Sequence, residues 1–137
     1  MKPTYLLLFF ALFIFTSCEQ NSTEATESNE TTMEEPDRLL RHVVLFNFTD
    51  STSREDIQKI EQAFASLPGK IDEIHSFEWG TNNSPEGLDK GLTHCFFVTF
   101  RSEEDRDAYL PHPAHQEFVE LVGPAVEDVT VVDYWTK

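Results

Sequence analysis

The order of apolar and polar positions predicts alternating strands and helices over residues 38–137. Segments 41–48 and 92–100 are largely apolar, so both faces of each carry apolar side chains. Strands of that kind lie in the interior of a sheet. Residues 71–80 alternate between apolar and polar, which predicts an edge or half-solvated strand. We expect a fourth strand over 129–135.

The first helix is predicted from a capping signal and a periodic stripe. Thr52, with Glu55 three residues later, resembles a capping box. Apolar side chains follow at helical spacing, at Ile57, Ile60, Phe64 and Leu67. Pro68 and Gly69 end the helix, whose apolar stripe we expect to be buried.

The second helical region is divided by proline. Ser102 is suited to cap its start, and acidic residues in the first turn complement the helix dipole. Pro111 and Pro113 interrupt the helix, which resumes over 113–122 and stops before Pro124.

This βαββαβ order predicts an α+β, ferredoxin-like protomer with strand order 4-1-3-2. The first and third strands are then the interior pair, in agreement with their apolar faces. Two helices cover only one face of such a sheet and leave apolar side chains of the other face exposed. A second copy of the chain, packed sheet to sheet about a two-fold axis, would bury them. We therefore expect a homodimer.

The charge of the chain excludes one class of partner. It has 25 acidic and 10 basic side chains, a formal net charge of -15. No run rich in Lys or Arg occurs, so the chain lacks the electrostatic footprint of a nucleic-acid-binding protein. We expect no nucleic-acid partner.

The N-terminal part of the chain predicts export and lipidation. Residues 1–17 contain an apolar run that is too short for a bilayer core, which takes about 20 helical residues, but is typical of a signal peptide. Cys18 after Ser17 resembles the lipobox of bacterial lipoproteins and is the expected lipidation site; plain secretion and an uncleaved anchor are the alternatives. Residues 18–37 are acidic, without bases or aromatics, and predict a disordered tether. The domain at 38–137 would then be lipid-anchored at the bacterial cell envelope, on its periplasmic or surface side.

Four stretches of the domain resemble the stress-responsive dimeric α+β-barrel (A/B barrel) proteins. They are Arg41-His42-Val43-Val44-Leu45-Phe46, Thr93-His94, Tyr109-Leu110-Pro111-His112-Pro113-Ala114-His115 and Val132-Asp133-Tyr134. The Tyr-x-x-His-Pro-x-His run is the most specific of them, and the resemblance covers about residues 38–135. It implies a ferredoxin-like protomer whose sheet closes with that of a second copy into a shared barrel. It implies no single activity, since the family holds plant stress proteins, bacterial proteins of unknown role and a branch of plant polyketide cyclases.

The candidate chemistry lies in the histidines of these stretches. His42 and His94 each share a predicted strand face with apolar side chains, so both could point into one cavity. His112 and His115 follow Tyr109 at intervals of three, on a helix face turned toward the sheet. Neutral imidazole is a workable general base, and tyrosine can donate a hydrogen bond to a developing oxyanion. In the cyclase branch, the positions matching Tyr109 and His115 form the catalytic pair of an intramolecular aldol step, so the resemblance implies that role here.

Each histidine also has a structural interpretation. His112, before a proline at a helix start, is typical of a cap, and His42 and His94 can be hydrogen-bonded core residues. His75 lies outside the quoted stretches and is expected to be structural, and Cys95 is expected to be a small buried hydrophobe. The histidine spacing lacks a third ligand for a metal, and we expect neither a metal nor a cofactor.

Two functions follow from the sequence. The first is a lipid-anchored homodimeric barrel that binds a small hydrophobic or phenolic ligand, with proton-transfer chemistry by His115 and Tyr109 in a pocket lined by His42, His94 and His112. The second is a non-enzymatic envelope protein with a stress-protective or scaffolding role, whose histidines are structural.

Overall fold

The computed structural model describes residues 37–137. The predicted signal peptide, the lipidation site at Cys18 and residues 18–36 of the predicted tether lie outside this range. Within 37–137, no helix combines the length and the apolar composition needed to cross a membrane.

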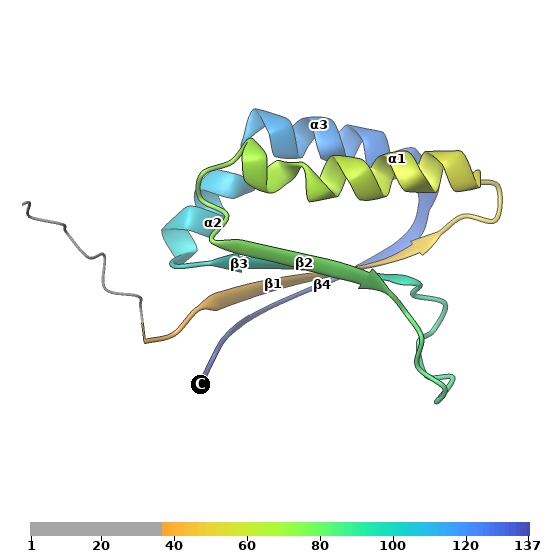
Figure 1. Ribbon diagram of the computed structural model, residues 1–137, viewed down its shortest axis with the longest axis horizontal. Helices are drawn as coiled ribbons and strands as arrows, with labels where there is room; N and C mark the ends of the chain where they lie inside the picture. Colours follow the sequence, from red (N-terminus) through yellow and green to blue (C-terminus); the bar gives the residue numbers. More distant parts are fainter. Residues whose placement is uncertain (1–36) are drawn as a thin grey trace, which may run out of the picture. The chain divides into compact units, whose positions relative to one another are not determined.

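Four antiparallel strands form one sheet in the order β2-β3-β1-β4 (Figure 1). They are β1 (Leu40–Phe48), β2 (Ser76–Thr81), β3 (His94–Phe100) and β4 (Val126–Trp135). The two apolar strands, β1 and β3, are the interior pair, as the sequence predicts. The predicted ferredoxin-like topology is confirmed.

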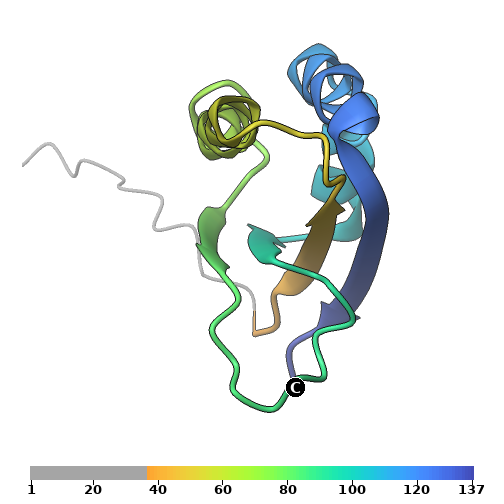
Figure 2. The ribbon, with the colours of Figure 1, turned by 90° about the vertical axis from the view of Figure 1, so that its right-hand side faces the viewer.

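The α-helices lie on one side of this sheet. They are α1 (Arg54–Ala65), α2 (Glu103–Tyr109) and α3 (Pro113–Val122). Figure 2 shows α1 above the β2 side of the sheet and α3 above the β4 side. The predicted division of the second helical region is confirmed, because Ser102 caps α2 and Pro113 begins α3. Short 3-10 turns follow α1 and α3, at Leu67–Gly69 and Gly123–Ala125.

Aromatic rings hold the helices to the sheet. The ring centroid of Phe64 on α1 lies 4.4 Å from that of Phe96 on β3 and 4.5 Å from that of Phe118 on α3. The ring of Phe46 on β1 adjoins both Phe64 and Phe96. Aromatic pairs of this kind contribute roughly 0.5–1.5 kcal/mol beyond the burial of their area. The cluster joins both interior strands to both long helices.

Helix α1 is capped one residue later than the sequence predicts. The Oγ of Ser53 accepts a hydrogen bond from the backbone N–H of Asp56 at 3.1 Å, and the Ser53 hydroxyl donates to the Asp56 carboxylate at 2.7 Å. The Thr52 hydroxyl instead donates to the carbonyl of Ala125 at 2.8 Å. A tertiary hydrogen bond therefore uses the side chain that the sequence pattern assigns to the cap.

The predicted strand over 71–80 is a strand only from Ser76 onward. Ile71 and Ile74 are buried in turns: the N–H of Ile71 donates to the Leu67 carbonyl at 3.0 Å, and the N–H of Ile74 donates to the Ile71 carbonyl at 3.3 Å. The apolar side chains at these two positions are therefore buried by turns and not by a pleated backbone.

The other strand ends shift as well. β3 begins at His94 instead of residue 92, and β4 begins at Val126 instead of residue 129. At the far end of the β1–β4 pair, the N–H of Leu39 donates to Oγ1 of Thr136 at 2.8 Å, and the N–H of Thr136 donates to the Leu39 carbonyl at 2.9 Å. The two ends of the domain are therefore adjacent.

The face of the sheet opposite the helices carries the apolar patch that the sequence predicts. Val43, Leu45 and Phe97 are half-buried there, and Val132 and Tyr134 are 49% and 45% exposed. Figure 1 shows the helices on the opposite side only.

Candidate functional site

A cavity of about 420 Å³ lies between α3 and the strands β1 and β4, on the helix side of the sheet. Its β4 wall is only partly covered, since Val129 and Val131 are 42% and 50% exposed. The lining is mostly apolar, and its polar side chains are few: His42, Tyr109, His115 and Asp133. A volume of this size suits a small organic molecule.

The register of β1 against β4 gives the cavity a direction. Facing pairs along the two strands change from polar to apolar: His42 with Asp133, Val44 with Val131, and Phe46 with Val129. The first and last pairs are four residues apart, which is roughly 13 Å along a strand. A ligand that fills the cavity would place its polar group at the first pair and its apolar body along β4.

The hydroxyl of Tyr109 is the unsatisfied group of the cavity. The side chain is fully buried and, among residues 37–137, no partner accepts or donates a hydrogen bond at its hydroxyl. An unpaired buried hydroxyl costs roughly 1–3 kcal/mol. Burial also raises the pKa of Tyr109, so the phenol keeps its proton. Tyr109, a residue of the cavity wall, therefore has a protonated hydroxyl with an unused hydrogen bond to donate.

His115 lies beside Tyr109, with the two ring centroids 4.3 Å apart. Its Nδ1 is 2.9 Å from the carbonyl oxygen of Leu110, which can only accept, so Nδ1 carries a proton. Burial lowers the pKa of His115 and favours the neutral ring near neutral pH. The neutral ring then has Nε2 free to accept a proton.

His42 also lines the cavity and is bonded to a carboxylate. Its Nδ1 lies 2.7 Å from Oδ1 of Asp133, while Oδ2 of Asp133 lies 3.3 Å from Nη1 of Arg106. The centroid of the His42 ring is 5.9 Å from that of Tyr109, with the rings edge to face. Three titratable rings thus meet at one end of the cavity.

His94 and His112 do not line this cavity, contrary to the expectation from the sequence. His94 lies opposite Phe46 in the β1–β3 register, four residues along from His42, and its Nε2 is 3.1 Å from Oε1 of Glu61 on α1. His112 lies between α2 and α3, where its Nδ1 accepts the N–H of Ala114 at 3.2 Å and caps α3. Tyr109 ends α2 and His115 lies in α3, so the two residues do not share one helix face as the sequence predicts.

Asp133 and Arg106 are the site residues that sequence reasoning missed. Asp133 stands in one of the quoted stretches, but its contact with His42 depends on the register of β4 against β1. Its only sequence signal is an acidic residue within the mainly apolar segment 129–135. Arg106 stands among charged residues of a helix and gives no comparable signal.

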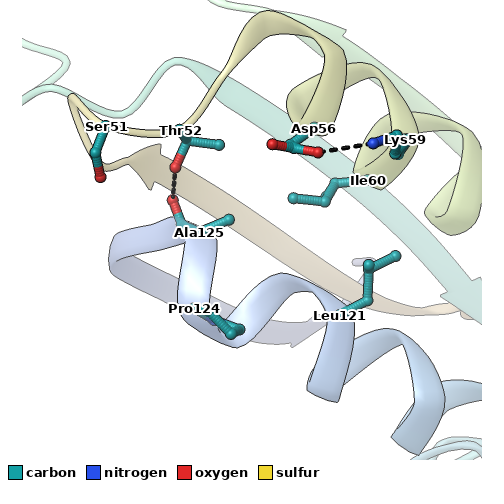
Figure 3. Close-up of a pocket in the computed structure, with 8 residues that line it drawn as sticks. All are labelled: Ser51, Thr52, Asp56, Lys59, Ile60, Leu121, Pro124 and Ala125. Atoms are coloured by element: carbon teal, nitrogen blue, oxygen red, sulfur yellow. Dashed lines mark hydrogen bonds and ion pairs between the residues drawn. The ribbon is translucent and has the colours of Figure 1, made fainter.

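A second cleft of the domain offers less chemistry than this cavity. A cleft of about 300 Å³ lies between the start of α1 and the end of α3 (Figure 3). Its polar side chains are bonded internally, since Lys59 pairs with Asp56 at 2.9 Å and Thr52 donates to Ala125. Cys95 is half-buried, and burial raises its pKa. Over the described residues, no group of three His, Cys, Asp or Glu side chains is placed to hold a metal ion.

Sequence comparison establishes the family of the chain. The family model "Stress responsive A/B Barrel Domain" matches residues 40–136. The chain belongs to this family. HS1, a stress-response A/B barrel domain-containing protein from Arabidopsis thaliana, is 38% identical over 102 residues, which cover 74% of this chain and 94% of HS1. Olivetolic acid cyclase from Cannabis sativa is 25% identical over 95 residues, which cover 69% of this chain and 94% of the cyclase.

Solved structures have a fold similar to that of this chain. Hydroxynitrile lyase from Passiflora edulis is 26% identical with a TM-score of 0.70, over 76% of this chain and 96% of the lyase. A dimeric protein of unknown function from Bacteroides fragilis, with a ferredoxin-like fold, is 26% identical with a TM-score of 0.58, over 70% of this chain and 94% of that protein. Proteins similar to this chain therefore include enzymes and dimers.

The partly buried, neutral state of His115 predicts a loss of stability in acid. Because its folded pKa is lowered, below the unfolded value of about 6.5 the unfolded chain binds a proton that the folded chain does not. The free energy of unfolding should therefore fall as the pH drops below about 6.5. Urea unfolding at about pH 7.5 and about pH 5.5 measures this loss of free energy. His115→Asn should make the loss smaller. The control His112→Asn, which keeps a side chain suited to cap α3, should leave the loss unchanged. An equal loss in His115→Asn and wild type would contradict it.

Proposed function

We propose that the cavity binds a small hydrophobic or phenolic molecule and that His115 and Tyr109 transfer protons on it. The observation that carries this proposal is the buried hydroxyl of Tyr109, a residue that lines the cavity beside His115 and whose hydroxyl has no partner within the described chain. A ligand oxygen would supply the missing acceptor. The apolar walls favour a ligand whose remaining surface is hydrocarbon or aromatic.

The proposed step is a proton abstraction. Nε2 of His115 takes a proton from an acidic C–H or O–H bond of the ligand, and the electron pair of that bond stays on the ligand as an enolate or phenolate. The Tyr109 hydroxyl donates a hydrogen bond to the oxygen that gathers this charge. The proton returns from His115 to the ligand in the second half of the reaction. Two similar proteins are named as enzymes, a cyclase and a lyase, which supports a reactive cavity.

A matched pair of probes tests the ligand class. Para-propylphenol and propylbenzene differ by one hydroxyl, and the wild-type protein should bind the phenol about tenfold more tightly, because the hydroxyl pairs with a buried donor at a gain of about 1.4 kcal/mol. Tyr109→Phe should bind both probes equally in calorimetric titrations. His115→Ala should fold normally and lose the preference for the phenol. Equal binding of the two probes by the wild type would refute the proposal.

The second candidate function is a non-enzymatic envelope protein with a stress-protective or scaffolding role. It is favoured by His94 and His112, whose hydrogen bonds to Glu61, Thr93 and the start of α3 are structural. On this alternative His115 is structural too, and His115→Ala should lower the free energy of unfolding by about 1 kcal/mol with no probe binding in any variant.

We also propose that two copies of the chain associate through the open face of the sheet. The half-exposed apolar side chains of that face, Val132 and Tyr134, support an interface there, as does the dimeric Bacteroides fragilis protein of similar fold.

A charge placed on that face should separate the protomers. Val132→Glu would bury an unpaired carboxylate at the interface, so the variant should be monomeric in size-exclusion chromatography with light scattering. Leu121→Glu is the matched control, since Leu121 is 45% exposed on the helix side and its substitution should leave the dimer intact. Dissociation by both variants, or by neither, would argue against this interface.

Attachment to the cell envelope through Cys18 is the last part of the proposal. Its support is the apolar run over residues 5–15, the Ser17-Cys18 pair that follows it, and the acidic spacer before the domain. In a bacterial host, the mature protein should carry a diacylglyceryl group on Cys18 in its intact mass and sediment with membranes. Cys18→Ser should remove both properties, whereas Cys95→Ser should retain them; an unmodified Cys18 in the mature protein would contradict the anchor.

A further inference from the structure

Arg106 is connected to the polar end of the cavity without lining it. Its Nη1 lies 3.3 Å from Oδ2 of Asp133, and Oδ1 of the same carboxylate lies 2.7 Å from Nδ1 of His42. One carboxylate therefore bridges a guanidinium on α2 and an imidazole on β1. The side chains of Arg106, Asp133 and His42 are 21%, 29% and 7% exposed, so water screens this bridge only in part.

The bridge determines which ring nitrogen of His42 carries the proton. A carboxylate oxygen accepts hydrogen bonds, so Nδ1 of His42 is the donor. In the neutral ring, Nε2 is then unprotonated and can accept a proton in the cavity that His42 lines. A carboxylate held at both oxygens keeps its orientation toward His42, and a planar guanidinium is well suited to hold it.

Arg106 is itself oriented by its neighbour in the chain. Its Nε and Nη2 donate to Oδ1 of Asp107 at 3.1 Å and 3.0 Å. These two bonds fix the plane of the guanidinium and leave Nη1 for Asp133. Tyr109 follows Arg106 by three residues on α2, so the ion pair with Asp133 also joins the turn that carries Tyr109 to β4.

We propose that Arg106 is a positioning residue of the cavity. Through Asp133 it holds His42 in the Nδ1–H form and so provides a second proton acceptor, Nε2 of His42, at the end of the cavity where His115 and Tyr109 lie. This inference deepens the proposed function and takes its chemistry from it. The action of Arg106 on His42 is measurable without any ligand.

The tautomer of His42 is the readout of this role. NMR of ¹⁵N-histidine-labelled protein at about pH 8, where imidazole is neutral, distinguishes the Nδ1–H form from the Nε2–H form. Wild-type His42 should be mainly Nδ1–H. Arg106→Gln should lower the ratio of Nδ1–H to Nε2–H about fivefold, the scale of coupling within a shared hydrogen-bond network. Arg106→Lys, which keeps the charge but loses the fork, should lower it less.

Lys59→Gln is the matched control. It also removes a cation from a helix ion pair with aspartate, that of Lys59 with Asp56, and it should leave the His42 ratio unchanged. Asp133→Asn should abolish the preference for Nδ1–H, because the amide oxygen pairs with the Arg106 donor and the amide nitrogen is left to donate to Nδ1 of His42.

The outcomes separate the two proposals. An unchanged His42 ratio in Arg106→Gln overturns the role of Arg106, whether or not Asp133→Asn alters that ratio. If circular dichroism shows Arg106→Gln to be unfolded, the ratio in Arg106→Lys decides: a lowered ratio supports the role, and an unchanged one overturns it. Failure of the wild type to prefer the phenol probe removes the proposed function, while the tautomer measurement still decides how Arg106 acts on His42.

Discussion

The contact of Phe64 with Phe96 and Phe118 is the packing interaction on which the rest of the domain depends. It centres the helix layer on the two interior strands, because Phe96 belongs to β3 and the neighbouring Phe46 belongs to β1. Helix α3 lies above the β4 side of the sheet without covering all of that edge strand, and Val129 and Val131 remain exposed. The cavity is the space that this arrangement leaves. A tightly packed core and an open pocket are thus two results of one placement.

The distribution of hydrogen-bond partners distinguishes structural from chemical groups. His94 has Thr93 and Glu61 as partners, and His112 has the N–H of Ala114. Tyr109 is as deeply buried as any core residue but lacks a partner for its hydroxyl within the described chain. Since a buried polar group without a partner is costly, its presence beside an open cavity indicates a group that a ligand completes.

Much of this fold follows from sequence pattern, because the pattern records burial. The two apolar strands, the proline-divided helices and the bare face were all predictable on that ground. The turns over residues 71–75 could not be predicted, and a strand was expected there instead, since a residue buried in a turn, such as Ile71, looks in the sequence like a residue buried in a strand. The cavity that the sequence predicts for both His42 and His94 is lined by His42 alone, because a strand face can be predicted from sequence but the distance between two residues of that face depends on register. The His42–Asp133–Arg106 chain joins three elements distant in sequence, and no local signal reports it.

The paired hydrogen bonds between Leu39 and Thr136 make the two ends of the domain a single location. Arg38 lies over the ring of Trp135 at the same place, 5.5 Å from its centroid, and reinforces it. A segment joined at either end of the domain would therefore leave the sheet from the same edge, away from the helices. New segments at either end of the domain would leave the helix layer and the cavity unchanged. A short linker between the two ends would also allow circular permutation of the domain.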